Sequence, residues 1–464
     1  MSYSHYLGSV TSALRDRVLP RLDDQEARGV LEAAIRTLAG LADTFETDRL
    51  VPPLLDLPSA ATRLDGPPEN GAVRIGSAAT IAAAVERLRD DDWLQGGSVS
   101  AEARTMIVWE RDRMSEAFAA MTRVERPVES DSLDTGPNPL LIPREEVETY
   151  FQGKYGGAAR VGDFRQATGG RSRQTVLFTL EGQNDLPRDL VIQRDHPAGI
   201  SPDSVVDSYP VLALLAGTEL MSPRPLLVEP SQEPLGAPFM VTTQSRGEIA
   251  GPDYFDPPRD PALGMQLAGQ LGILHAVDTT PLRGTLRSTI APDDSWAAEL
   301  DRLEATWNRF THWPSIAATA SFAWMRAHVD EIGDEAAIIH NDAVFHNILV
   351  DEGRITALLD WELVHLGHPA EDLGYCRPFI MRMGDWEEFL DAYVAAGGRR
   401  FSRNTIDYFS LRSQLHLMTL FQNGGRRMFE ARATDDINLA EVGASFMPKV
   451  MLRLSEILSA VIAG

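Results

Sequence analysis

The alternation of apolar and polar residues divides the chain into a helical first part, a strand-rich middle and a helical last part. Apolar residues recur every three to four positions at 7–18 and 30–41, as one face of an amphipathic helix requires. Two further helical stretches follow around 77–90 and 100–124. Residues 1–130 are therefore predicted to form an all-helical N-terminal region. No catalytic cluster occurs in it, so we expect a packing or homo-oligomerisation module.

A linker and a smaller lobe are predicted next. Residues 131–143 are rich in Ser, Asp, Gly and Pro, which is typical of a linker. The predicted small lobe, 144–244, has strand patterns at 174–181, 189–193, 225–229 and 238–243 and a helical pattern at 203–217. Residues 245–464 are predicted to form a larger helical lobe with one strand-rich island at 338–360. The fold class is therefore α+β.

Composition limits the partners of the chain. Its 464 residues include 67 acidic and 43 basic ones, with a formal net charge of -24. Nucleic acids and anionic membranes attract basic surfaces, so we expect neither as a partner. The sequence contains no apolar run of membrane-spanning length and no signal-peptide pattern at its start, and it has a single cysteine, Cys376. These features predict a cytoplasmic protein.

The strand-rich island carries the clearest candidate chemistry. It reads IIHNDAVFHNILVDEGRITALLDWE, with Asn347 five residues after Asp342 and Asp360 thirteen after Asn347. Two apolar runs joined by Asp-Glu-Gly predict a hairpin with Asn347 at its entry and Asp360 at its exit. A carboxamide and a carboxylate placed together suit a hard divalent cation such as Mg²⁺. Asp342, on the preceding loop, can orient and deprotonate an attacking hydroxyl.

The segments HNDAVFHNILV and LLDWELVHLGHPAEDLGY resemble the aminoglycoside phosphotransferase family, small-molecule kinases that share the protein-kinase fold. The resemblance covers about residues 145–464 and is closest to a branch that includes kinases associated with acyl-CoA dehydrogenases. It implies a two-lobed protein-kinase-like fold behind the N-terminal region. It also implies that Asp342 is the catalytic base, that Asn347 and Asp360 bind Mg²⁺, that His340 braces the loop and that Asp372 anchors it.

The segment 167–175, ATGGRSRQT, is predicted to cover the phosphates of ATP. Gly169 and Gly170 allow close backbone approach, and Ser172 and Arg173 offer hydrogen-bond donors. The pattern is not G-x-G-x-x-G, and a plain glycine turn that opens a hairpin is the alternative.

The strand that follows lacks the lysine with which protein kinases hold the phosphates. Both lysines of the chain, Lys154 and Lys449, lie elsewhere. Alignment with the family places Gln193 at the lysine position, whereas chemistry favours Arg194, whose guanidinium is always charged. We prefer Arg194 and keep Gln193 as its rival. Asp207 is the candidate substitute for the usual glutamate of the next helix, although it is shorter and displaced by one position.

The favoured function is ATP- and Mg²⁺-dependent phosphorylation of a hydroxyl on a small molecule, namely a metabolite alcohol, a hydroxyacyl-CoA or an antibiotic. The alternative is a catalytically weak, pseudokinase-like module that binds a nucleotide or a metabolite. The candidate residues of the acceptor pocket or its rim are Tyr375, Arg377, Arg382, Trp386, Arg426 and Arg427.

Overall fold

The computed structural model describes residues 84–121 with interruptions, 142–167, 173–195, 203–251, 257–290, 294–310, 315–431 and 437–463, together with scattered positions between 11 and 38. The chain forms two compact units. The helical unit contains Met1–Asn138, Asp294–Ile332 and Asp407–Gly464, and the sheet unit contains Pro139–Asp293 and Gly333–Ile406. This grouping differs from the predicted boundaries, because two segments assigned to the larger lobe belong with the N-terminal region.

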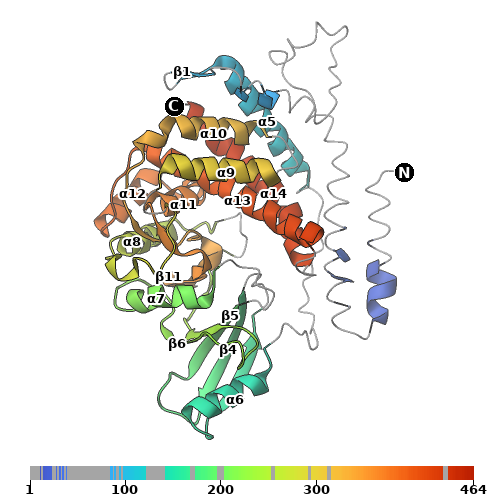
Figure 1. The fold of residues 1–464 in the computed structure, drawn as a ribbon, viewed down its shortest axis with the longest axis vertical. Coiled ribbons are helices and arrows are strands. Elements are labelled where there is room, and N and C mark those ends of the chain that lie inside the picture. Colours follow the sequence, from blue (N-terminus) through green and yellow to red (C-terminus); the bar gives the residue numbers. More distant parts are fainter. Residues whose placement is uncertain are drawn as a thin grey trace. The chain divides into compact units, whose positions relative to one another are not determined.

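The sheet unit contains a five-stranded antiparallel sheet with the strand order β3-β4-β5-β7-β6. Its strands are Arg160–Gln166 (β3), Arg173–Glu181 (β4), Asp189–Asp195 (β5), Pro225–Glu229 (β6) and Phe239–Thr243 (β7). Alternate apolar residues of these strands face helix α6 (Arg144–Tyr155), which lies along one side of the sheet (Figure 1). Phe151 of α6 is fully buried against Phe178. The predicted strands are confirmed, whereas β3 and α6 are not predicted by the sequence pattern.

Helix α7 (Val205–Leu215) contacts β5, β6 and β7. The side chain of Ser204 accepts a hydrogen bond from the N–H of Val206 and caps the start of this helix. The carboxylate of Asp195, the last residue of β5, accepts hydrogen bonds from the hydroxyl of Ser204 (2.5 Å) and from the N–H of Val205 (2.9 Å). The sheet therefore holds the start of α7 in place.

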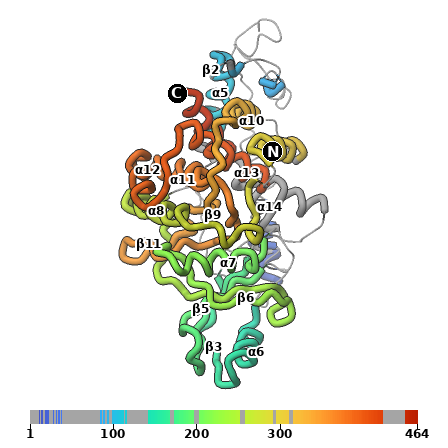
Figure 2. Tube along the Cα trace, turned by 60° about the vertical axis from the view of Figure 1, so that its left-hand side comes forward, coloured from blue at the N-terminus to red at the C-terminus, as the bar shows by residue number. Residues whose placement is uncertain are grey.

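The remainder of the sheet unit is built around helices α8 (Pro261–His275), α11 (Ala370–Met383) and α12 (Trp386–Ala395), which lie side by side (Figure 2). Gly272 allows the close approach of α8 and α12, because a Cβ atom there would lie 2.5 Å from the carbonyl oxygen of Tyr393. The described elements include two small sheets. The first pairs β9 (Ala337–Ile339) with β12 (His365–Gly367), and the second has the order β11-β10-β8, with strands Arg354–Leu358, Ile348–Asp351 and Glu248–Ile249.

The described helices of the helical unit come from both ends of the chain and from its middle. They are α5 (Ala101–Met121), α9 (Trp296–Phe310), α10 (Ile316–His328), α14 (Ile437–Ala463) and α13 (Arg403–Ala431) from Asp407 onward. The N-terminal region also contains a short antiparallel hairpin, β1 (Leu94–Gln95) and β2 (Ser98–Val99), so the prediction of an all-helical region is corrected at this point. Across the part of the chain that the structure describes, no helix is long and apolar enough to cross a membrane.

One buried carboxylate joins the N-terminal region to α10. Glu110 of α5 accepts hydrogen bonds from the N–H groups of Ile316 (3.0 Å) and Ala317 (2.6 Å). The first N–H groups of a helix have no partner within the helix, so an acceptor from outside satisfies them. Burial is the main cause that raises the pKa of Glu110 to about 7, although these hydrogen bonds act in the opposite direction.

We expect the substitution Glu110→Ala to lower the unfolding temperature, because two buried N–H groups lose their acceptor at a cost of about 1–3 kcal/mol each. Between pH 4.5 and about 7, the raised pKa means that the folded protein binds more protons than the unfolded chain. The stability that Glu110 contributes therefore falls as the pH rises through this window. Thermal unfolding of the wild type and the variant should differ more at pH 5 than at pH 8, and a difference that grows with pH would contradict this account.

Candidate active site

The loop that follows β9 is held by one carboxylate from α11. Asp372 accepts hydrogen bonds from the backbone N–H groups of His340 (2.9 Å) and Asn341 (2.7 Å). Its Oδ2 also lies 3.0 Å from Nε2 of His275 on α8. Asp372 and His340 are both fully buried. The prediction that Asp372 anchors this loop is confirmed.

His340 supports the same loop from the interior. Its Nε2 lies 2.8 Å from the carbonyl oxygen of Leu359, and its Nδ1 accepts the N–H of Asp342 at 3.3 Å. These two partners require a neutral ring that is protonated at Nε2. Burial lowers the pKa of His340 and so favours this neutral form. The structural role expected for His340 is confirmed.

Both oxygens of the Asp342 carboxylate are held by hydrogen bonds. Asn347 donates from Nδ2 to Oδ2 (2.7 Å), and the hydroxyl of Tyr375 donates to Oδ1 (2.6 Å). Tyr375 is expected from the sequence only as a pocket or rim residue, so its role in orienting Asp342 is new. Its spacing of three residues from Asp372 on α11 is the signal for this role, since residues three apart lie on the same face of a helix.

The predicted hairpin is present. Ile348 of β10 pairs with Leu358 of β11, and Glu352 and Gly353 form the turn with φ angles of 47° and 76°. At the open end, the N–H of Leu359 donates to the carbonyl oxygen of Asn347 at 2.7 Å. Asn347 and the residue that follows Leu359, Asp360, therefore lie at the same end of the hairpin, as the sequence predicts.

Asp360 is the most perturbed carboxyl group near this loop. Burial raises its pKa well above the ordinary value, and the charges of Glu362 and Asp342 raise it further. Its φ angle of 62° is left-handed, a conformation that non-glycine residues rarely adopt. Asn341, on the neighbouring loop, is also left-handed at 64°. Two unusual backbone positions thus flank the functional side chains, as is common where a site fixes its geometry.

The predicted phosphate-covering segment lies only partly within the description. Gly169, Gly170 and Ser172 are outside the described residues. Arg173 begins β4 and is 4% exposed, and no nitrogen of its guanidinium group has a hydrogen-bond partner in the described part of the chain. Burial raises the pKa of both Asp360 and Asp203, and the charge of Arg173 opposes this rise.

Arg194 and Gln193 lie on opposite faces of β5. The guanidinium of Arg194 donates to the side chain of Gln174 and to the carbonyl oxygen of Leu235, and its cross-strand partner is Gln174. Arg194 shares its face with Ile192, which packs toward α6. This placement does not support our preference for Arg194 as the group that holds phosphates. It favours Gln193, which is uncharged, as the residue at the lysine position.

The carboxylate of Asp207 is engaged in a hydrogen bond within its own helix start, not in an ion pair with a basic residue of β5. Its Oδ2 accepts the backbone N–H of Ser204 at 2.9 Å and completes the capping box of α7. The expectation that Asp207 substitutes for the usual glutamate is therefore corrected: the side chain of Asp207 helps to start its own helix.

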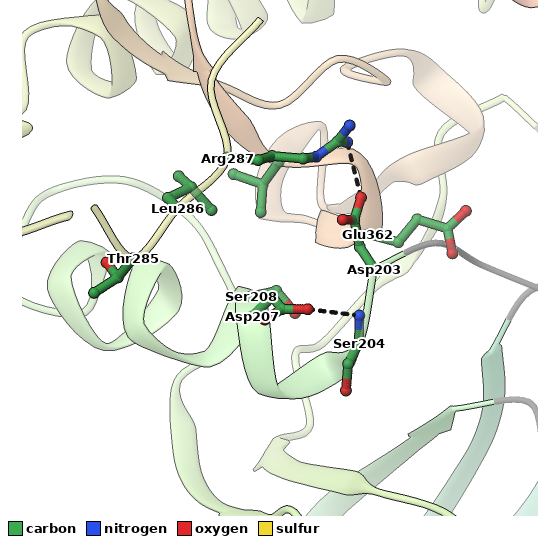
Figure 3. A pocket seen from close by; sticks show the side chains of 9 residues that line it. Asp203, Ser204, Asp207, Ser208, Thr285, Leu286, Arg287 and Glu362 are labelled. Carbon is green, nitrogen blue, oxygen red and sulfur yellow. Dashed lines mark hydrogen bonds and ion pairs between the residues drawn. The ribbon is translucent and has the colours of Figure 1, made fainter. Parts of the chain in front are cut away.

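A small polar pocket lies beside the start of α7 (Figure 3). Its volume is about 180 Å³, and carboxylates of Asp203, Asp207 and Glu362 line it. Arg287 enters from the opposite side and forms an ion pair with Asp203 at 2.9 Å. Glu362 lies two residues after Asp360, so this pocket borders the hairpin end that carries Asp360. Sequence patterns gave no indication of this pocket, because its residues come from three separated segments.

The arrangement separates two chemical tasks. Asp342 presents a carboxylate that is oriented at both oxygens and can accept a proton from a hydroxyl group. Asn347 uses Nδ2 to hold Asp342, so its Oδ1 is not engaged in that hydrogen bond, and Asp360 lies at the same end of the hairpin. Such oxygen pairs suit Mg²⁺.

Comparisons with known proteins show which family and which fold this chain resembles. The model of the APH phosphotransferase enzyme family matches residues 163–412. Acyl-CoA dehydrogenase family member 11 of Gallus gallus is 28% identical over 229 residues, which cover 46% of this chain and 28% of that protein. The Rattus norvegicus protein of the same name is 25% identical over 201 residues, which cover 41% of this chain and 25% of that protein. The similarity therefore spans only about a quarter of the length of these relatives.

A solved structure supports the fold. The crystal structure of a putative aminoglycoside phosphotransferase from Ralstonia eutropha aligns with 69% of this chain and 99% of its own, with a TM-score of 0.53 and 19% sequence identity. The predicted α+β, kinase-like fold is thereby confirmed, with the N-terminal region outside the family match. Because the family model matches more than half of the sequence, the chain belongs to the APH family of phosphotransferase enzymes.

Proposed function

We propose that this protein transfers the γ-phosphoryl group of ATP to a hydroxyl group of a small molecule, with Mg²⁺ as the metal. The observation that carries the proposal is the Asp342 carboxylate, which Asn347 and Tyr375 orient next to a hairpin end with two further oxygen ligands. Phosphoryl transfer depends mainly on positioning and charge neutralisation. Asp342 and its hydrogen-bond partners supply positioning, and a cation held at the hairpin end would supply neutralisation.

In the proposed reaction, Asp342 accepts the proton of the acceptor hydroxyl. The hydroxyl oxygen forms a bond to the γ-phosphorus as the bond between that phosphorus and the β–γ bridging oxygen breaks, and ADP leaves. The hydrogen bonds to Asp342 hold its carboxylate in one orientation, so little reorganisation is needed when the proton moves.

The residues present fit Mg²⁺. Asp360 is a half-buried carboxyl group, and desolvation raises its pKa well above the ordinary value. A divalent cation would compensate the charge of the carboxylate, with Asp360 and Oδ1 of Asn347 as protein ligands. When bound, Mg²⁺ supplies neutralisation of the phosphate charge.

The identity of the acceptor is the less defined part of the proposal. Similarity to acyl-CoA dehydrogenase family member 11 supports a hydroxyacyl-CoA or another metabolite alcohol, and the family as a whole also supports an antibiotic. We further propose that the protein acts in the cytoplasm without a nucleic-acid or membrane partner, because its net charge of -24 disfavours polyanions. Homo-oligomerisation through the N-terminal region remains part of the proposal.

A second candidate is a pseudokinase-like module that binds a nucleotide or metabolite with weak or no catalysis. Gln193 carries no charge at the lysine position, and Asp207 is used in the capping box of α7. ATP turnover over a panel of alcohols and hydroxyacyl-CoA esters separates the two candidates. Nucleotide binding without turnover on any acceptor would favour the second.

We expect Asp342→Asn to lower kcat by at least about a hundredfold, because an amide cannot accept the proton of the hydroxyl group. Nucleotide binding should persist, since Asp342 acts on the acceptor. Asp351→Asn is the matched control, because Asp351 is exposed on the same hairpin. Steady-state kinetics and nucleotide titration of both variants check the assignment, and near-wild-type turnover in the Asp342 variant would refute it.

The substitution Asp360→Asn should remove the Mg²⁺-dependent part of nucleotide binding, because the metal loses its anionic ligand. Asparagine tolerates left-handed backbone, so the φ angle of 62° can be retained. Calorimetric titration with ADP, in Mg²⁺ and in EDTA, measures the difference between the two conditions. We expect this difference to be large in the wild type and in Asp351→Asn and nearly absent in the Asp360 variant. An unchanged Mg²⁺ dependence would exclude Asp360 as a ligand.

A further inference from the structure

Arg173 is a buried cation with no hydrogen-bond partner in the part of the chain that the structure describes. The side chain is 4% exposed, and neither Nε nor the two terminal nitrogens form a hydrogen bond with any described residue. Removing a charged group from water without compensation costs several kcal/mol. A protein keeps such a group where something outside the folded chain completes it.

The strand register explains why Arg173 lacks a partner. Its cross-strand neighbour is Asp195, whose two carboxylate oxygens accept hydrogen bonds from Ser204 and Val205 at the start of α7. The Asp195 carboxylate is thus hydrogen-bonded to the start of α7. Among the described residues, the guanidinium of Arg173 therefore has no acceptor, and a bound anion can supply one.

The same register places Arg173 on the functional face of the sheet. Arg173 pairs with Asp195, and Thr175 pairs with Gln193. Cross-strand partners lie on the same face, and residues two apart along a strand share it. Arg173 and Gln193 therefore project from one face, whereas Arg194 and Gln174 project from the other. Gln193 carries no positive charge. Arg173 carries one on the same face, two residues along β4 from Thr175, the cross-strand partner of Gln193.

Arg173 also lies close to the predicted metal ligand. The charge of Arg173 reaches the carboxyl groups of Asp360 and Asp203, although Arg173 forms no hydrogen-bonded ion pair with either of them. A buried cation and two half-buried carboxylates therefore lie near each other without a hydrogen bond between them. A ligand that carries both phosphate oxygens and a divalent cation would compensate both charges, because Arg173 would bind the anionic oxygens and Asp360 would bind the metal.

We propose that Arg173 binds the phosphate chain of the nucleotide and takes the part that a lysine on the next strand has in protein kinases. The inference rests on the proposed function, since it assumes a Mg²⁺-nucleotide at this site. An arginine keeps its charge at any working pH, and its planar fork can hold two phosphate oxygens. The positively charged side chain that binds phosphate thus lies at the start of β4 instead of on β5.

Phosphate binding by Arg173 and a purely structural role of Arg173 predict opposite effects of its removal on the unfolding temperature. An unpaired buried charge destabilises the nucleotide-free protein, so replacing it with a neutral side chain of similar size should raise the unfolding temperature or leave it unchanged. The same replacement should weaken nucleotide binding. A structural arginine would instead lower stability when it is removed.

The test compares the wild type with Arg173→Gln, Arg173→Lys and the control Arg188→Gln, whose guanidinium is 61% exposed on the loop before β5. Each protein is titrated with ADP plus Mg²⁺ and with adenosine, which lacks phosphates. We expect Arg173→Gln to weaken binding of Mg²⁺-ADP by roughly ten- to a hundredfold while adenosine binding stays the same. Arg173→Lys should recover part of the loss, and Arg188→Gln should match the wild type.

The results distinguish the role of Arg173 from the proposed phosphotransferase function. Binding of Mg²⁺-ADP to the wild type with undiminished affinity in Arg173→Gln would overturn the role of Arg173 and leave the proposed function standing. Equal loss for ADP and adenosine, with a lower unfolding temperature, would identify a structural role and also overturn it. Failure of the wild type to bind either ADP or ATP in the presence of Mg²⁺ would overturn both proposals. Recovery of binding when Gln193→Lys is added to Arg173→Gln would support the shift of the cation between strands.

Discussion

The geometry of the candidate site depends on the buried carboxylate of Asp372. This side chain accepts two consecutive backbone N–H groups of the loop after β9 and contacts His275 of α8. Such hydrogen bonds to a charged acceptor are stronger than those between neutral groups. They fix the backbone at Asn341 in a left-handed conformation and so determine where Asp342 emerges. Tyr375, one helical turn further along α11, then sets the orientation of the Asp342 carboxylate. One helix thus positions both the backbone and the side chain of the loop.

Around this fixed loop, the charged groups fall into two classes. Asp342 and Asp372 have their oxygens satisfied by protein donors. Arg173 is buried and Asp360 is half-buried, they form no hydrogen-bonded ion pair with each other, and desolvation raises the pKa of Asp360. The satisfied groups define a rigid frame, whereas the uncompensated groups mark where an external ligand gains the most from binding.

The sequence predicts the parts of the structure that local patterns encode. The hairpin of β10 and β11 follows from two apolar runs around Glu352 and Gly353, and the spacing of Asp342, Asn347 and Asp360 follows from that hairpin. The face on which Arg194 lies depends on the pairing of β5 with β4, and the use of Asp207 depends on where α7 begins. These are tertiary facts that no short window contains. The role of Tyr375 requires knowing that Asp372 points at the loop, and the isolation of Arg173 requires knowing that Asp195 is bound to α7.

The contact between Glu110 and the start of α10 changes how the boundaries of this protein are understood. The family match begins at residue 163, yet α9 and α10, which lie inside the match, belong to the same compact unit as α5 and α14. A chain trimmed to the family match would leave the first N–H groups of α10 without their acceptor and remove the helices that pack against it. Helix α5 of the N-terminal region is therefore an integral part of the folded unit, and removing it is expected to impair the folding of the family-matched segment itself.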